Sequence, residues 1–239
     1  AIGLVFALIM GFLPTQFMGL FGTDAAVVAT AARYARIVGW SYLFDSFVQV
    51  YIGVHRAMGN PSRGLVILGA SMASNTFLNW MFIFGNLGAP RLAEQGAALA
   101  TLLARVLSCS IAVGWAVLDK QFKLSPALLF RPGGEMTRRF IRFSTPVMCN
   151  ETFWGLGTSL FPTIMGHMEG SQEILAAYAI AGNITNLCTV GVFAISGTAA
   201  ILIGQEIGSG RADRVYSLGA LLNALAFLFG LGAGLLFLG

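Results

Sequence analysis

The chain is a succession of apolar runs, several of them about twenty residues long, and the short segments between them carry most of the charge. A helix needs about 20 apolar residues to cross the ~30 Å hydrocarbon core of a bilayer. Only 10% of the 239 residues are charged, whereas soluble domains carry about 25%. The sequence therefore predicts an all-α, polytopic membrane protein.

Turn and helix-stop signals divide the chain into about seven expected spans. Asp24 is a suitable N-cap for the helix that follows it, and Gly59, Asn60 and Pro61 form a strong helix stop. The expected helices cover residues 1–20, 24–58, 63–84, 96–118, 141–167 and 173–205, and a seventh starts near Val215. Because the sequence opens and closes inside apolar runs, we expect a fragment of a longer chain.

The basic residues concentrate on alternate connections between these spans. The longest polar connection, residues 119–140, contains Lys120, Lys123, Arg131, Arg138 and Arg139. Cytoplasmic loops carry an excess of Lys and Arg, so we expect this connection in the cytoplasm. The net charge of +4 is explained by these loops and is not taken as a sign of nucleic-acid binding.

Residues 141–165 form an apolar run that contains a single carboxylate, Glu151. At ~1.5 Å per helical residue, Glu151 lies about 13 Å beyond Arg142, near the middle of a ~30 Å hydrocarbon core. An ionisable group at that depth is costly and by default indicates a functional site. Pro146, about one turn earlier, is compatible with a broken helix. The alternative is a protonated Glu151 buried against neighbouring helices.

Two charges of opposite sign are expected at one depth in different spans. Asp45 lies near the middle of the second expected helix, and Arg105 lies near the middle of the fourth. Opposite charges inside a membrane usually pair. We therefore predict a contact between Asp45 and Arg105, with a structural role favoured over a role in transport.

Uncharged polar residues form a second group at membrane depth. Asn75 and Asn79 are one helical turn apart and share a face, and Thr101 lies on the next helix. Their oxygens can bind a small hard cation. On spacing alone, hydrogen bonding between the helices is favoured. Asn150, beside Glu151, is a second ligand or a hydrogen-bond partner of the carboxylate.

Several function classes lack their motifs in this sequence. It contains no GxxxxGK[ST] phosphate-binding loop, no HExxH, no paired CxxC and no GxSxG. It also contains no arginine ladder and no TVGYG filter. These absences argue against an ATP-driven pump within this stretch, and the obvious signatures of membrane hydrolases and channels are missing.

Several segments together resemble one family of transporters, the multidrug and toxic compound extrusion (MATE) family. PVMCNETFWGLG, residues 146–157, is similar to a P-x-x-x-N-E-x-x-W motif on the seventh helix of that family. The other similar segments are LAAYAIAGNI, IGQEIGSGRAD, GNPSR, LNWMFIFGNLGAP and QGAALATLLAR. The likeness covers nearly the whole chain in order and spacing.

The resemblance implies a fold of twelve helices in two six-helix lobes around a central cavity. This chain would supply the third to ninth helices. Residues 1–118 would form the last four helices of the N-terminal lobe, residues 119–140 the connection between the lobes, and residues 141–239 the first three helices of the C-terminal lobe.

The resemblance also implies a function and a set of site residues. The family exports organic cations, drugs or toxins in exchange for sodium ions or protons, and its bacterial branch places an acidic residue where Glu151 lies. Asn75, Asn79 and Thr101 match positions of a cation site in the N-terminal lobe, although some relatives have Asp where this chain has Asn79. Asp45 is not part of the family pattern.

The resemblance further implies two kinds of partner, small hydrophobic organic cations and the lipid bilayer. We expect a monomeric protein of the bacterial inner membrane, with no cofactor beyond a coupling sodium ion or proton and no catalytic activity. Any sodium ion would lie near Glu151. Two alternatives stay open at this point. One is a flippase for lipid-linked saccharides of related architecture, and the other is an integral membrane transferase.

Overall fold

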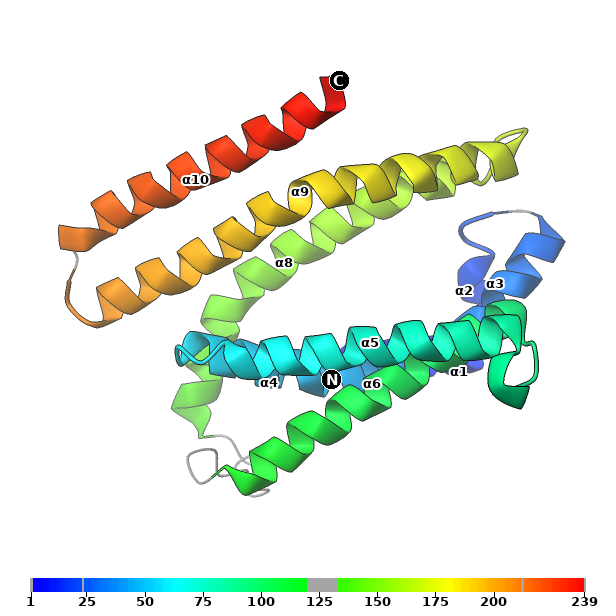
Figure 1. Ribbon diagram of the computed structural model, residues 1–239, viewed down its shortest axis with the longest axis horizontal. Helices are drawn as coiled ribbons and strands as arrows, with labels where there is room; N and C mark the ends of the chain where they lie inside the picture. The colour runs from blue at the N-terminus through cyan, green and yellow to red at the C-terminus, as the bar shows by residue number, and fades with distance from the viewer. Residues whose placement is uncertain (1, 23, 120–132, 212, 239) are drawn as a thin grey trace. The chain divides into compact units, whose positions relative to one another are not determined.

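The computed structural model describes residues 2–22, 24–119, 133–211 and 213–238. Its helices are α1 (Ile2–Phe12), α2 (Pro14–Met18), α3 (Ala25–Val38), α4 (Ser41–Ala57), α5 (Ser62–Phe84), the 3-10 turn η1 (Asn86–Gly88), α6 (Ala93–Leu118), α8 (Gly134–Met165), α9 (Ser171–Gly208) and α10 (Asp213–Leu238). They are drawn in Figure 1. The all-α class is confirmed. Two compact units are present, residues 1–55 with 60–169 and residues 56–59 with 170–239.

The first expected span, residues 1–20, is interrupted. Helix α1 ends at Phe12, Leu13 leaves the helical region with φ of −123° and ψ of 38°, and Pro14 then opens the short helix α2. Proline has no backbone N–H and a fixed φ, so it is tolerated in the first turn of a new helix and not within a continuing one. Pro14 therefore divides the run that hydropathy alone presents as continuous.

The expected long helix 24–58 is two helices, α3 and α4, bent by 51°. Asp24 caps α3 as predicted, since its carboxylate accepts hydrogen bonds from the backbone of Ala26 and Val27. The bend lies at Gly39, where an added Cβ would come 2.5 Å from the Cβ of Met10. The close approach of α1 at this point requires a glycine, and glycine is also a poor helix former.

Helices α5 and α6 pack against each other more extensively than the other described helix pairs and lie side by side in Figure 1. Small residues recur every fourth position along α6 and are buried, namely Gly96, Ala100, Ala104, Ser108, Ala112 and Ala116. Small side chains allow two membrane helices to approach closely. Beside this stripe, the best-buried cluster joins Val48, Tyr51 and Ile52 of α4 to Ile67 of α5.

Gly96 gives a direct test of this packing. An added Cβ would lie 2.7 Å from the backbone carbonyl oxygen of Phe82, so the two helices would have to separate. We expect Gly96→Ala to lower the free energy of unfolding in detergent by about 1–3 kcal/mol, as overpacking does. Gly114→Ala on the same helix is the control, because an added Cβ there meets nothing within 4 Å. Equal effects of the two substitutions would contradict this account.

The described helices include fewer apolar spans than the seven expected. Four are long and apolar enough to cross a membrane, namely α5, α6, α9 and α10, and α3 with α4 would make a fifth as one bent span. Helix α1 has only 11 residues. Helix α8 has 32 residues, but Asn150, Glu151 and the Ser, Thr and Pro residues around them lower the hydropathy of its central part. It begins at Gly134, within the expected connection 119–140, of which residues 120–132 lie outside the described residues.

The unit of residues 170–239 consists mainly of α9 and α10, which lie side by side (Figure 1). The turn between them contains an ion pair in which Arg211 Nε lies 2.7 Å from Glu206 Oε2. This hydrogen bond to the Glu206 carboxylate raises the pKa of Arg211 above its ordinary value. The pair therefore stabilises the local turn.

Candidate functional site

Three of the predicted polar residues form a hydrogen-bonded chain between α5 and α6. Asn79 Nδ2 donates to Asn75 Oδ1 at 3.0 Å, and Asn75 Nδ2 donates to Thr101 Oγ1 at 3.5 Å. The Thr101 hydroxyl donates in turn to the carbonyl of Ala97 at 2.9 Å. The one-turn spacing of the two asparagines on α5 and the close packing of α6 place the three side chains together.

This chain leaves one oxygen without a donor. Asn79 Oδ1 is buried and accepts no hydrogen bond from the described residues. A buried acceptor without a partner is costly, and such atoms are rare unless they serve a ligand, an ion or water. Asn75 Oδ1 and Thr101 Oγ1, each of which accepts one of these hydrogen bonds, are also uncharged oxygens of the type that hard cations prefer. The hydrogen bonds join the two helices, and a cation site at these residues stays a prediction.

Asp45 and Arg105 are in contact, at the depth where the sequence places both. Arg105 Nη1 lies 2.9 Å from Asp45 Oδ1, and their side chains are 33% and 24% exposed. The contact joins α4 to α6. Thr101 and Arg105 are four residues apart on α6 and share a face, so the ion pair lies one turn from the hydrogen-bonded chain. Its role in structure or in transport stays a prediction.

Glu151 and Asn150 are placed apart from these contacts. Both lie in α8, which continues as one helix through Pro146 and Pro162, and both are exposed. Among the described residues, neither side chain forms a hydrogen bond or an ion pair. None of the described residues buries any residue of α8, so the role of Glu151 stays a prediction.

Comparison with known protein families decides the classification. The MatE family profile matches residues 1–81 and 146–239, which is more than half of the chain. The chain belongs to the MatE family. The matched segments include Asn75, Asn79 and Glu151, whereas Thr101 and Arg105 lie between them. This MatE chain is a multi-pass membrane protein.

Curated relatives of the MatE chain are bacterial. It is 24% identical over 192 residues to a probable multidrug resistance protein NorM of Thermotoga maritima, covering 80% of this chain and 41% of that protein. It is 22% identical over 242 residues to a probable multidrug resistance protein YoeA of Bacillus subtilis, covering 95% and 52%. The chain spans about half the length of the curated relatives it matches. No solved structure matches it.

The MatE chain also contains a polar cluster that was not predicted, formed by Tyr51, His55, Arg63 and Asp119. Arg63 Nη1 donates to Asp119 Oδ2 and lies 2.9 Å from His55 Nε2. His55 Nδ1 lies 3.1 Å from the carbonyl of Tyr51. The sequence contained a signal for three of these residues. A Tyr and a His lie one helical turn apart before the helix stop, and an Arg follows soon after it. Asp119, far along the chain, had no such signal.

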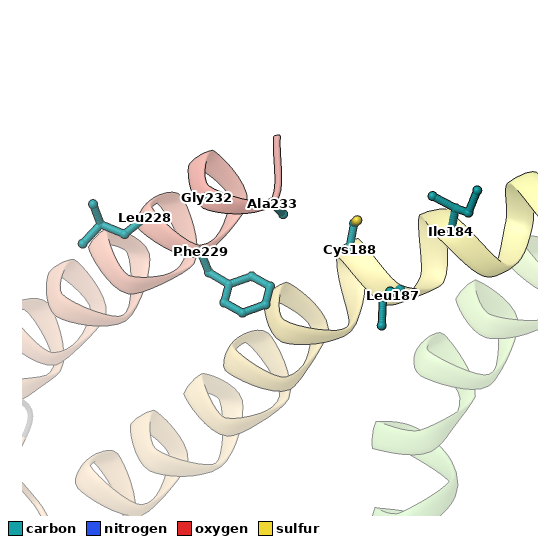
Figure 2. A pocket seen from close by; sticks show the side chains of 7 residues that line it. All are labelled: Ile184, Leu187, Cys188, Leu228, Phe229, Gly232 and Ala233. Carbon is teal, nitrogen blue, oxygen red and sulfur yellow. The ribbon is translucent and has the colours of Figure 1, made fainter. Parts of the chain in front are cut away.

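In the unit formed by α9 and α10, the MatE chain has an apolar groove of about 580 Å³. Its lining residues are Ile184, Leu187, Cys188, Leu228, Phe229, Gly232 and Ala233. Figure 2 shows the ring of Phe229 directed toward α9. An added Cβ at Gly191 would lie 2.1 Å from that ring, so the absence of a side chain there makes room for it. The groove contains no charged residue.

Proposed function

We propose that the full-length protein containing this sequence is a secondary antiporter of the bacterial inner membrane. It exports small hydrophobic organic cations in exchange for sodium ions or protons. The observation that carries the proposal is the Glu151 carboxylate in the central part of α8, in a chain of the MatE family. The names of the relatives NorM and YoeA, which describe probable multidrug resistance proteins, support the substrate class.

The proposed mechanism is competition at Glu151. A bound sodium ion or proton neutralises the carboxylate and favours one facing state of the transporter, whereas the organic cation binds the ionised carboxylate and favours the other. A coupling ion shifts such an equilibrium only by its difference in affinity for the two states. In this proposal the ionised Glu151 carboxylate is the group for which the coupling ion and the organic cation compete.

In this proposal the side-chain oxygens on α5 and α6 form a second binding site for the coupling ion. Asn79 Oδ1 has no donor among the described residues, and Asn79 is hydrogen-bonded through Asn75 to Thr101, which supply further oxygens. Because none of these groups titrates near neutral pH, this place suits a sodium ion better than a proton. Asn150 remains a candidate ligand beside Glu151.

The lipid-flippase alternative requires a basic cavity to hold a pyrophosphate group. Arg105 is the basic residue at membrane depth, and its charge is compensated by Asp45 at 2.9 Å. Since a paired guanidinium is a weaker anion site than a free one, this contact favours the antiporter over the flippase. No described residue specifically favours the transferase.

Reconstitution of the full-length protein into liposomes tests the proposal. A sodium gradient and a pH gradient are imposed in turn, and the export of a fluorescent organic cation is followed. Export driven by one gradient supports the antiporter and identifies the ion. Absence of export under both gradients, with movement of a lipid-linked saccharide instead, would contradict the proposal in favour of the flippase.

Thr101→Val tests the sodium ligands separately from Glu151. The substitution keeps the shape of the side chain and removes one oxygen, so we expect the affinity for sodium to fall about tenfold, or ~1.4 kcal/mol. The measurement is the sodium-dependent rise in unfolding temperature, which reports binding to the native state. Ser110→Ala is the control, because this exposed hydroxyl of α6 bonds only its own helix, to the carbonyl of Val106. An unchanged sodium response in Thr101→Val would assign the three residues to helix packing alone.

A further inference from the structure

Two opposite charges lie about one helical turn from the hydrogen-bonded chain of Asn75, Asn79 and Thr101. Arg105 follows Thr101 by four residues on α6, so the two share a face and are about 6 Å apart along the helix axis. Arg105 Nη1 lies 2.9 Å from Asp45 Oδ1 of α4. A full positive charge and the carboxylate that compensates it are therefore close to the oxygens proposed to bind sodium.

The other charged residues of α5 and α6 lie further from these oxygens. On α5 the charged residue is Arg63, twelve residues before Asn75, which is about 18 Å at the helical rise. On α6 the other charged residue is Glu94, seven residues before Thr101, or about 10 Å. On the two helices that carry the oxygens, the nearest charge is therefore that of Arg105.

The contact between Asp45 and Arg105 compensates charge without good hydrogen-bond geometry. Asp45 Oδ1 is buried and accepts no hydrogen bond from the part of the chain that the structure describes, although Arg105 Nη1 is only 2.9 Å away. An arginine and a carboxylate frequently meet through two parallel hydrogen bonds, which fix their geometry. Here the opposite charge of Asp45 is a clearer property of the contact than its fit.

A cation held by uncharged oxygens is sensitive to a charge this close. The length of the Arg105 side chain added to the helical rise gives a separation of roughly 10 Å between its guanidinium and an ion at Thr101. At that distance, with an effective dielectric constant of about 20, one unit charge changes the affinity for a monovalent ion about tenfold. An uncompensated Arg105 would therefore oppose sodium binding.

We infer that Asp45 is a positioning residue for the coupling ion, which acts through Arg105. By compensating the guanidinium charge, it allows the oxygens of Asn75, Asn79 and Thr101 to hold a sodium ion. The inference rests on the proposed function, which places a second ion site at these oxygens. It gives the ion pair a role in addition to joining α4 to α6.

The sign of the effect separates this role from a structural one. Asp45→Asn and Arg105→Gln break the same contact, so a pair that only joins two helices would change sodium affinity in the same direction in both variants, or in neither. Compensation of charge predicts opposite directions. Asp45→Asn leaves an uncompensated positive charge near the ion, whereas Arg105→Gln leaves an uncompensated negative charge.

The test measures sodium binding to the full-length protein carrying Glu151→Gln, so that sodium at Glu151 does not contribute. The sodium-dependent rise in unfolding temperature gives the affinity, and choline chloride keeps the ionic strength constant. The measurement is made at about pH 8.5 to favour ionised carboxylates. Relative to this parent, we expect Asp45→Asn to lower the sodium affinity about tenfold and Arg105→Gln to raise it about tenfold.

Three further variants make the test specific. Asp45→Asn with Arg105→Gln removes both charges, so we expect its sodium affinity to stay within about twofold of the parent. Asp45→Glu keeps the negative charge and is expected to stay within about threefold. Glu94→Gln is the control on α6, because it breaks a pair with Arg33 whose side chains are 56% and 42% exposed, and exposed charges are screened by salt.

Three results would overturn this inference alone. They are a lower affinity in both single variants, an unchanged affinity in Arg105→Gln, and a loss in the double variant as large as that in Asp45→Asn. The second result is decisive even if Asp45→Asn does not fold. A parent without any sodium-dependent rise would instead overturn the second ion site of the proposed function, and this inference with it. Export by the wild-type protein in liposomes tests the antiporter separately.

Discussion

Glu151→Gln is expected to reduce gradient-driven export by the full-length protein about 5- to 150-fold. Gln has nearly the shape of Glu and cannot bind a proton or present a negative charge to sodium. The two facing states would then no longer differ in affinity for the coupling ion, and such differences are typically worth 1–3 kcal/mol, or about 5- to 150-fold. We expect the initial export rate in liposomes to fall by about that factor under either gradient.

A matched control lies on the same helix. Glu135 is in the first turn of α8 and is exposed, so Glu135→Gln changes the same chemical group outside the apolar run. We expect export by Glu135→Gln to stay within about twofold of the wild type, as exposed substitutions usually do little. Full export by Glu151→Gln would show that this carboxylate has only a structural role.

Asp45→Asn is expected to produce the largest loss of stability. It leaves the Arg105 guanidinium without its partner, and breaking a buried ion pair from one side costs about 3–5 kcal/mol. The Arg105 and Asp45 side chains are 33% and 24% exposed, so we expect a smaller loss than for a fully buried pair, about 2–3 kcal/mol. The measurement is the free energy of unfolding in detergent.

The double variant Asp45→Asn with Arg105→Gln shows whether the loss comes from the pair. Because both charges are removed together, we expect most of the stability to return, by at least about 1 kcal/mol relative to Asp45→Asn. Glu94→Gln, which breaks the exposed Arg33–Glu94 pair at 3.4 Å, is expected to cost less than about 1 kcal/mol. Additive losses in the double variant would mean that the two residues act independently.

Much of the helical arrangement was predictable because hydropathy is a property of consecutive residues. The helices expected at 63–84, 96–118 and 173–205, and the one from Val215, correspond to α5, α6, α9 and α10 with shifted ends. The depth of a polar residue is equally local, since it follows from a count of residues along a helix. The expected depth was enough to predict the contact between Asp45 and Arg105, because charged side chains at one level of a membrane have few other partners.

The positions at which helices break or bend were less predictable, because they depend on which residues of other helices pack against them. Pro14 could be read from the sequence, but the apolar run continues on both sides of it, so hydropathy did not indicate the break between α1 and α2. The bend at Gly39 depends on the approach of Met10 from α1, and no property of residues 24–58 reports that contact. Glu151 was located by its apolar surroundings, whereas its exposure on α8 came from the tertiary structure.

The sequence by itself therefore determined the membrane class, the main helices and the polar residues at membrane depth, because each follows from neighbours along the chain. Only the tertiary structure decided which helix faces meet. It brought Thr101 to Asn75, left Asn79 Oδ1 without a donor in the part of the chain that the structure describes, and joined His55 and Arg63 to Asp119. These contacts depend on the distance and rotation between packed helices, which small residues on α6 set and which no periodicity within one helix contains.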